Sequence, residues 1–232
     1  MTDLLFTLPP QPVVPVIGES RAFPVRRIFC VGRNYAEHAK EMGFEVDREA
    51  PFYFLKPTSA LVHTGATTPY ALGTNNLHYE MEFVVALSGH AFRATTANAM
   101  DAVYGYACGL DMTRRDLQIS HRDKGRPWDF GKAFENSAII APITPKAAFG
   151  EIGPQRITMS QNGAVKQDST LDQLIWSVPE IIAHLSQFYH LAPGDLIYTG
   201  TPAGVGAVKP GDVLHGEITG LAPLDLTIGA TE

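Results

Sequence analysis

The chain is poor in several features that mark particular protein classes. Among its 232 residues there are only two cysteines, Cys30 and Cys108, each flanked by apolar residues. We therefore expect buried free thiols rather than a disulfide, a metal site or a nucleophile. No apolar run approaches the roughly 20 residues that a membrane-spanning helix needs. The first residues also lack the basic segment of a signal peptide, so we expect a cytoplasmic protein.

Positive charge is also scarce. The formal net charge is −6 at pH 7, and no run of Lys or Arg occurs. Nucleic acids and anionic membranes bind concentrated basic surfaces, so we expect neither as a partner. The local exception is a basic cluster formed by Arg114, Arg115, Arg122, Lys124 and Arg126. This cluster is either a solvated helix and loop or a surface that receives an anionic substrate beside a metal.

The length and composition favour one sizeable hydrophobic core. Hydrophobic residues make up 45% of the chain and charged residues 18%, as in ordinary globular proteins. Residues 1–24 are rich in proline and lack periodicity, which predicts an extended arm over the domain or over a neighbouring subunit. Residues 25–232 are expected to form a single catalytic domain. Predicted strands outnumber helices without regular alternation, so the fold class is α+β.

The expected elements follow from apolar runs bounded by turn residues. Strands are predicted at 27–31, 52–55, 80–87, 104–111, 137–140, 156–161, 196–199, 213–218 and 224–228. Helices are predicted at 34–42, ended by Gly43, and at 178–190, where Ser177 and Glu180 form a capping-box pattern. Asn162-Gly163 is typical of a two-residue hairpin turn.

Three acidic residues indicate a metal site. Glu80 and Glu82 lie two apart in a predicted strand and so face the same way, and Asp111 lies in another predicted strand. Such a pair is commonly one solvated face of an antiparallel sheet. However, the apolar run 83–87 predicts burial on both faces, and buried carboxylates repel each other unless protonated or neutralised by a cation. Oxygen ligands without nearby Cys or His favour Mg²⁺, Mn²⁺ or Ca²⁺.

Two further patterns indicate groups for catalysis. His38 and Glu41 are three apart on a predicted helix, where a carboxylate can orient an imidazole and raise its basicity; the alternative is a charged solvent face. Lys132 stands between apolar neighbours and is expected to point inward, where an ammonium can stabilise an enolate oxygen. Lys56 follows an apolar strand and is either an active-site cation or a lysine at the edge.

Six segments, in order along the chain, resemble the fumarylacetoacetate hydrolase family and its short bacterial branch of acylpyruvate hydrolases. They are residues 31–42, 54–57, 80–82, 110–118, 131–134 and 198–206. The resemblance implies the family's mixed β-roll or sandwich with a few packed helices, and a homodimer. It also implies that Glu80, Glu82 and Asp111 hold Mg²⁺ or Mn²⁺, with Ca²⁺ as a further occupant in a structure.

The resemblance also implies a reaction. This is hydrolysis of a carbon–carbon bond in a 2,4-diketo acid, above all fumarylpyruvate going to fumarate and pyruvate in aromatic-acid (gentisate) catabolism. The pair His38 and Glu41 would activate water, and Lys132 would stabilise the leaving enolate. Alternatives with the same metal site are an oxaloacetate decarboxylase or a keto-acid isomerase. A non-catalytic, metal-stabilised binding protein is a further alternative.

The family pattern extends to substrate contacts. Arg115 and Gln118 match residues that hold the pyruvyl carboxylate and ketone oxygens, and Thr201 matches a substrate-contacting threonine. Fumarylpyruvate has a second, distal carboxylate that needs a cation in a closed cleft. The candidates for this cation are Arg33, Lys56, Arg114 and Arg126.

Overall fold

The computed structural model describes residues 5–43 and 48–232, which form a mixed α+β structure dominated by strands, as predicted. The larger sheet has eight strands: β4 (Phe52–Lys56), β3 (Arg27–Gly32), β15 (Asp195–Tyr198), β8 (Met81–Leu87), β9 (Val103–Asp111), β11 (Ala138–Ile140) and β5 (Leu61–His63), with β12 (Thr144–Pro145) on β9. The smaller sheet has the order β14 (Ala164–Thr170), β13 (Arg156–Gln161), β17 (Val213–Ile218), β18 (Leu224–Thr231) and β6 (Ala66–Tyr70).

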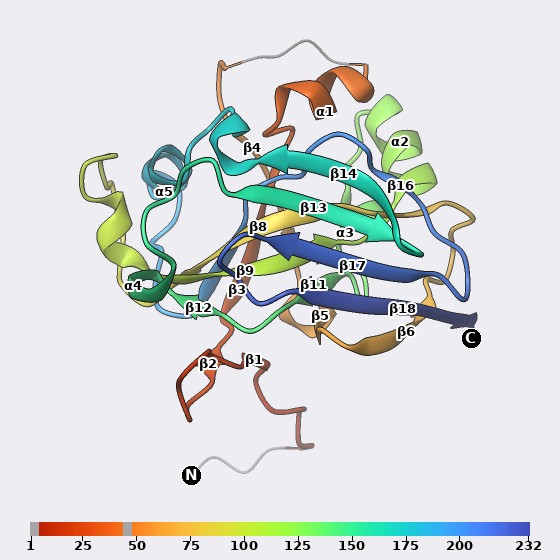
Figure 1. Cartoon of the computed structure of the whole chain (residues 1–232), viewed down its shortest axis with the longest axis horizontal. Coiled ribbons are helices and arrows are strands. Elements are labelled where there is room, and N and C mark those ends of the chain that lie inside the picture. Colours follow the sequence, from red (N-terminus) through yellow and green to blue (C-terminus); the bar gives the residue numbers. More distant parts are fainter. Residues whose placement is uncertain (1–4, 44–47) are drawn as a thin grey trace.

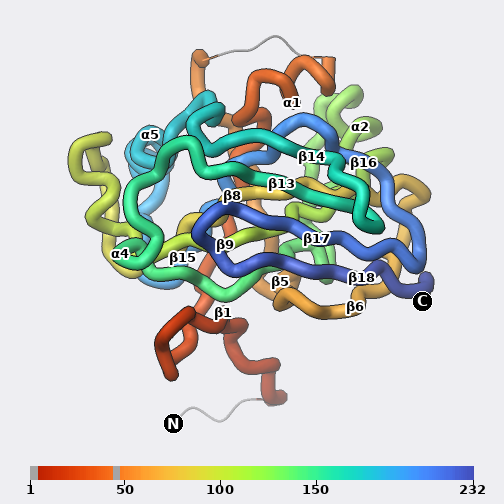
Figure 2. The backbone as a smooth tube through the Cα atoms, in the orientation of Figure 1, coloured from red at the N-terminus to blue at the C-terminus, as the bar shows by residue number. Residues whose placement is uncertain are grey.

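The two sheets pack face to face, with β13 and β17 over β8 and β9 (Figure 1). A third, short sheet joins β10 (Thr113–Arg114), β7 (Leu77–Tyr79) and β16 (Gly206–Ala207). The α-helices are α1 (Ala36–Glu41), α2 (Arg115–Asp123), α3 (Asp129–Lys132), α4 (Lys146–Phe149) and α5 (Val178–Leu185). Short 3₁₀ helices lie at Thr58–Ala60, Ala99–Ala102 and Leu171–Gln173. In the tube view, α1 and α2 lie together at one end of the sheets (Figure 2).

The larger sheet is buried on both faces, which explains the unbroken apolar run in β8. Met81, Phe83 and Val85 belong to the hydrophobic core between the sheets, whereas Val84 and Ala86 belong to a second core on the opposite face. Alternation in a strand therefore places the even-numbered residues of β8 away from the smaller sheet. The same face continues into the positions of the two glutamates, 80 and 82.

The N-terminal segment covers part of this second face. Strand β1 (Val13–Val14) pairs with β2 (Phe23–Pro24), and Val14, Val16 and Phe23 are buried in the second core. Val16 also makes a bridge to Ile143. The division of the chain into residues 1–24 and 25–232 remains a prediction.

The nine predicted strands are present with small shifts at their ends, and the Asn162-Gly163 turn connects β13 to β14 with both residues at positive φ. The remaining strands of the described residues were not predicted; they are β1, β2, β5, β6, β7, β10, β12, β14 and β16. The predicted helix 178–190 ends earlier, at Leu185, because the Ser186 hydroxyl donates to the carbonyl of Ala183 and accepts from the Ala94 N–H. Both cysteines are buried and free, as expected. Within the described residues, no helix is long and apolar enough to cross a membrane.

Gly109 tests how tightly the second face is packed. A Cβ atom there would lie 2.5 Å from Val84 Cγ2 and 2.7 Å from Tyr198 Cε1, both on buried side chains. We expect Gly109→Ala to lower the free energy of unfolding by about 1–3 kcal/mol through overpacking, measured by denaturant unfolding. Gly153→Ala is the control, because the nearest atom to its Cβ would be 3.8 Å away. Equal stability of the two variants would contradict this packing.

Candidate active site

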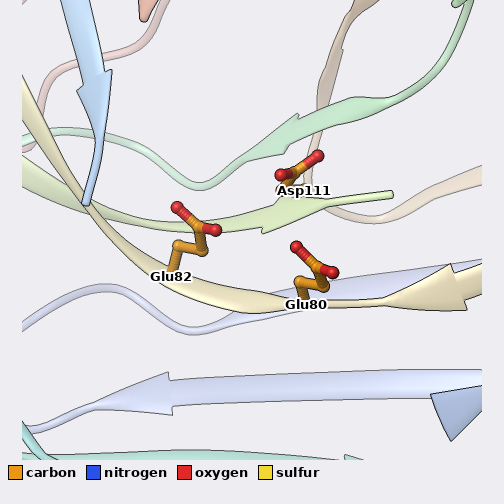
Figure 3. Close-up of side chains that lie close together, drawn as sticks. All are labelled: Glu80, Glu82 and Asp111. Carbon is orange, nitrogen blue, oxygen red and sulfur yellow. The ribbon is translucent and has the colours of Figure 1, made fainter. Parts of the chain in front are cut away.

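Three carboxylates meet on the second face of the larger sheet. Glu80 precedes β8, Glu82 lies in it, and Asp111 ends the neighbouring β9. Each side chain has an oxygen within 4.8 Å of an oxygen of the other two, and all three residues are at most 4% exposed (Figure 3). The spacing of two residues and the pairing of the strands bring them together, as the sequence predicted.

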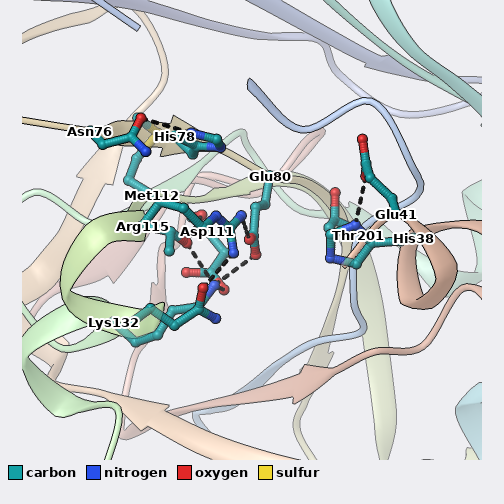
Figure 4. Close-up of polar contacts among 12 residues, drawn as sticks. His38, Glu41, Asn76, His78, Glu80, Asp111, Met112, Arg115, Lys132 and Thr201 are labelled. Atoms are coloured by element: carbon teal, nitrogen blue, oxygen red, sulfur yellow. Dashed lines mark hydrogen bonds and ion pairs between the residues drawn. The ribbon is translucent and has the colours of Figure 1, made fainter. Parts of the chain in front are cut away.

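Two lysines and an arginine surround two of these carboxylates, and Figure 4 shows Lys132 and Arg115 beside Glu80 and Asp111. The Lys132 ammonium donates to Glu80 Oε2 and Asp111 Oδ2, each at 2.7 Å, and to the Thr113 hydroxyl at 2.6 Å. The Lys56 ammonium lies 2.8 Å from Asp111 Oδ1, and Arg115 donates to Glu80 Oε1. Lys132 therefore points inward as predicted, and the Lys56 side chain is fully buried although it lies in β4, an edge strand of the larger sheet.

The surrounding charges and burial shift the pKa values of Glu80 and Glu82 in opposite directions. Burial raises the pKa of Glu80, but the charges of Lys132 and Arg115 outweigh it and hold that pKa well below its usual value. Burial, followed by the charges of Asp111 and Glu80, raises the pKa of Glu82 well above its usual value. For Lys132, burial lowers the pKa, but Asp111 and Glu80 raise it further.

The surroundings of the Glu82 carboxylate indicate that a cation fits between the three acidic residues. Among the described residues, no Lys, Arg or His lies within ion-pair distance of this carboxylate, which accepts a hydrogen bond from the Gly200 N–H at 2.8 Å. The neighbouring Asp111 Oδ1 has no hydrogen bond with acceptable geometry. A buried carboxylate without a counter-charge is unfavourable, and an all-oxygen donor set suits a hard divalent ion. Glu80, Glu82 and Asp111 are therefore the residues that can hold a metal.

A histidine and a glutamate form a dyad on α1 beside the carboxylates. His38 Nδ1 lies 3.1 Å from Glu41 Oε2, and His38 is buried to 6% exposure. Glu41 also accepts from the Gly204 N–H at 3.1 Å, which holds its carboxylate behind the ring. Glu41 can only accept while ionised, so Nδ1 carries the proton and Nε2 is the basic nitrogen. The arrangement is suited to remove a proton from water.

A buried asparagine anchors the start of α1. Asn34 Nδ2 donates to the carbonyls of Trp176 and Thr199, and its Oδ1 accepts from the Trp176 N–H at 2.7 Å. Gly200, with φ +100°, allows this contact, because a Cβ atom there would lie 2.7 Å from Asn34 Cβ. One small region thus supports both the dyad and the hydrogen bond to Glu82.

A single cavity collects nearly all the predicted residues. Its lining includes His38, Lys132, the three carboxylates, and the proposed substrate contacts Arg33, Arg115, Gln118 and Thr201. Arg115 and Gln118 lie on α2 and bond to each other. Of the four candidates for the distal carboxylate, only Arg33 belongs to this lining, together with Arg122 and the rings of Phe54 and Trp128.

The other three candidate cations do not line this cavity. Lys56 is engaged with Asp111 and with the carbonyls of Met112 and Lys132. Arg114 stacks over Phe134 and lines a different cavity, and Arg126 lines a third. Arg122 belongs to the basic cluster seen in the sequence but was not considered for this role.

Comparison with known proteins places the chain among enzymes. The family profile described as Fumarylacetoacetate (FAA) hydrolase C-terminal matches residues 27–229. A fumarylpyruvate hydrolase from Ralstonia sp is 52% identical over 82% of this chain and 100% of its own length. An oxaloacetate decarboxylase of Dictyostelium discoideum mitochondria is 41% identical over 84% of this chain and 90% of its own.

A solved structure is also very similar. It is the crystal structure of fumarylpyruvate hydrolase from Pseudomonas aeruginosa in complex with Mn²⁺ and pyruvate. It superposes with a TM-score of 0.95 at 46% identity and covers 98% of this chain and 100% of that one. The architecture expected from the sequence is thereby confirmed.

Metal binding can be measured without any substrate. We expect Glu82→Gln to weaken Mn²⁺ binding at least about 10-fold in calorimetric titration of metal-free protein, because the variant removes the carboxylate that lacks a counter-charge. Glu217→Gln, with an exposed side chain on β17, is the control and should bind like the parent. Equal affinity of Glu82→Gln and the parent would remove Glu82 from the metal ligands.

Proposed function

The chain belongs to the fumarylacetoacetate hydrolase family, and from this premise we propose that it hydrolyses a carbon–carbon bond of an acylpyruvate, above all fumarylpyruvate, to give fumarate and pyruvate. The observation that carries the proposal is the meeting of the His38–Glu41 dyad, the three carboxylates and Lys132 around one cavity. The similarity to fumarylpyruvate hydrolases supports the same substrate.

The dyad supplies the base. His38 Nε2 removes a proton from a water molecule, whose oxygen attacks the C4 carbonyl of the substrate. Glu41 keeps the imidazole in the required tautomer and stabilises the imidazolium that forms. The C3–C4 bond then breaks, fumarate leaves with the water oxygen, and the electron pair remains on pyruvate as an enolate that is protonated at C3.

We assign the pyruvyl end of the substrate to another part of the cavity lining. Arg115 and Gln118 suit its carboxylate and ketone oxygens, and Lys132 suits the enolate. All three protons of Lys132 are donated to protein oxygens, so one of these oxygens must find another partner before Lys132 can serve the substrate. When bound by Glu80, Glu82 and Asp111, Mg²⁺ or Mn²⁺ supplies the Lewis acidity that orients a 2-oxo acid and stabilises its enolate.

A second candidate activity uses the same site. Decarboxylation of oxaloacetate also produces pyruvate enolate, and a decarboxylase is among the similar proteins. Isomerisation of a related keto acid is a further possibility of the same kind. Hydrolysis is the better supported reaction, because it needs a base for water and the dyad provides one. The complete set of His38, Glu41 and Lys132 also argues against a binding protein without turnover.

We further propose that Arg33, with Arg122, receives the distal carboxylate of fumarylpyruvate. Arg33 lies 5.8 Å from the ring centroids of both Phe52 and Trp128, which position its guanidinium. Burial, and after it the charge of Arg122, lower the pKa of Arg33, and Arg122 itself pairs with Asp123 at 2.9 Å. A substrate carboxylate beside Arg33 would accept charge-assisted hydrogen bonds from its guanidinium.

A homodimer, a cytoplasmic location and a place in gentisate catabolism remain predictions from the family resemblance. Gel filtration with light scattering tests the first of them.

If His38 is the general base, replacing it should lower the rate of hydrolysis without weakening metal binding. We expect His38→Ala to lower kcat for fumarylpyruvate hydrolysis by about 10²- to 10⁴-fold in the Mn²⁺-loaded enzyme, since general-base catalysis is lost. Mn²⁺ affinity should stay close to that of the parent. His90→Ala, at an exposed position, is the control. An unchanged hydrolysis rate in His38→Ala would exclude the dyad from the mechanism.

The distal contact predicts a change in substrate preference. Acetylpyruvate lacks the distal charge, so Arg33→Gln should lower the ratio of kcat/KM for fumarylpyruvate over acetylpyruvate about 10-fold or more, as for a lost hydrogen bond to a charged group. Arg126→Gln should leave the ratio unchanged. The opposite pattern would assign the distal carboxylate to Arg126.

A further inference from the structure

Gln167 is a fully buried side chain on β14, the edge strand of the smaller sheet, where its neighbour Lys166 is exposed. The pairing of β13 and β14 shifts at this point, since Met159 pairs with Gln167 but Ser160 pairs with Val165. Lys166 is therefore an extra residue in the ladder. Such a bulge bends the strand and redirects the side chains beside it.

A glycine allows the bulge to reach the loop that follows β15. A Cβ atom on Gly204 would lie 2.0 Å from the carbonyl oxygen of Lys166, and Gly204 has φ +96°, in the left-handed region. Glycine satisfies both conditions, whereas a larger residue would push the strand and the loop apart. The contact brings Gln167 to Thr201 and Pro202 of this loop.

The Gln167 amide makes three hydrogen bonds that determine its orientation. Its Oε1 accepts from the Met81 N–H at 3.0 Å, and its Nε2 donates to Thr201 Oγ1 and to the Pro202 carbonyl, each at 2.8 Å. A backbone N–H can only donate and a carbonyl can only accept, so the amide cannot be reversed without two mismatches. The Thr201 hydroxyl oxygen consequently accepts a hydrogen bond from Gln167.

The Thr201 hydroxyl must therefore donate its own hydrogen bond to a group other than Gln167. Thr201 is 2% exposed and lines the same cavity as the three carboxylates. Over residues 5–43 and 48–232, the Thr201 hydroxyl accepts the hydrogen bond from Gln167 but donates none to another protein group. The acceptor for the hydrogen bond of the Thr201 O–H group must therefore lie in this cavity.

We propose that Gln167 is a positioning residue that makes the Thr201 hydroxyl a hydrogen-bond donor to an oxygen at the 2-oxo acid end of the substrate. The inference rests on the proposed function and adds to it the direction of this hydrogen bond and the residue that imposes it. The same amide also holds Met81, which lies between the proposed metal ligands Glu80 and Glu82. Any test must therefore separate substrate binding from metal binding.

A double-mutant cycle provides the test. Thr201→Val removes the donor. Gln167→Glu keeps an acceptor for the Met81 N–H but places a second carboxylate oxygen opposite the Thr201 hydroxyl, which would then donate its hydrogen bond to this carboxylate instead of to the substrate. In the Mn²⁺-loaded enzyme, we expect each variant to weaken pyruvate binding, measured by calorimetry, about 10- to 100-fold, as for a lost hydrogen bond to a charged group. kcat/KM for fumarylpyruvate should fall similarly. The double variant should be no worse than Thr201→Val alone.

Controls distinguish the role from a general structural one. Thr201→Ser keeps the hydroxyl and should retain most of the affinity that Thr201→Val loses. Gln173→Glu introduces the same charge at an exposed position and should bind pyruvate like the parent. Mn²⁺ titration of every variant should give affinities close to that of the parent.

Additive losses in the double variant, or parent-like pyruvate binding by Thr201→Val, would overturn the inference, as would losses explained by weaker Mn²⁺ binding. If Gln167→Glu does not fold, by circular dichroism, the Thr201→Val and Thr201→Ser pair decides, and equal losses in both overturn it. A parent enzyme that binds pyruvate but does not cleave fumarylpyruvate would refute the proposed function, while the binding cycle would still test this inference.

Discussion

Three carboxylates share one face of a sheet that is buried on both sides. Because water does not solvate them there, other groups in the protein must balance their negative charge. Lys132, Lys56 and Arg115 provide positive charge at Glu80 and Asp111. Because removing charges from water costs several kcal/mol for each ion, such a cluster persists only where each charge has a partner. Glu82 has no cationic partner of its own among the described residues, and a divalent cation bound between the three carboxylates would supply one.

The supporting residues come from segments far apart in the chain. Asn34 ties the start of α1 to the segments before α5 and after β15, so the dyad is held at a constant distance from the carboxylates. Gln167 ties the smaller sheet to the same loop and to the strand of the glutamates. The site therefore depends on how the two sheets pack, and a change in that packing would reach the metal ligands and the substrate contacts together.

The carboxylate cluster was predictable because its signal is local. A spacing of two in a strand places Glu80 and Glu82 on one face, and the apolar run after them indicates that this face is buried. Likewise, His38 and Glu41 are three positions apart on a helix and therefore share a face. The supporting contacts have no such signal. Gln167 stands in a strand that looks solvated by sequence, and only the bulge at Lys166 turns it inward.

The ion-pair partners of Arg115 and Lys56 could not be predicted from the sequence either. Arg115 and Gln118 lie three apart on α2 and share a face, but the ion pair of Arg115 with Glu80 joins residues 35 positions apart. Lys56 had two interpretations of similar weight, and its ion pair with Asp111 joins the ends of β4 and β9, which three strands separate in the sheet order. Long-range contacts of this kind follow from topology, which spacing alone does not determine.

The central claim is that a buried carboxylate cluster and a histidine–glutamate dyad act together in the hydrolysis of a carbon–carbon bond, with the dyad activating the water molecule. The most direct measurement is cleavage of fumarylpyruvate by the Mn²⁺-loaded enzyme in ¹⁸O-labelled water, with mass spectrometry of the products. The account predicts one ¹⁸O atom in the new carboxylate of each fumarate molecule formed, and loss of this product when Glu82 is replaced by Gln. No fumarate from fumarylpyruvate, with CO₂ released from oxaloacetate instead, would contradict it.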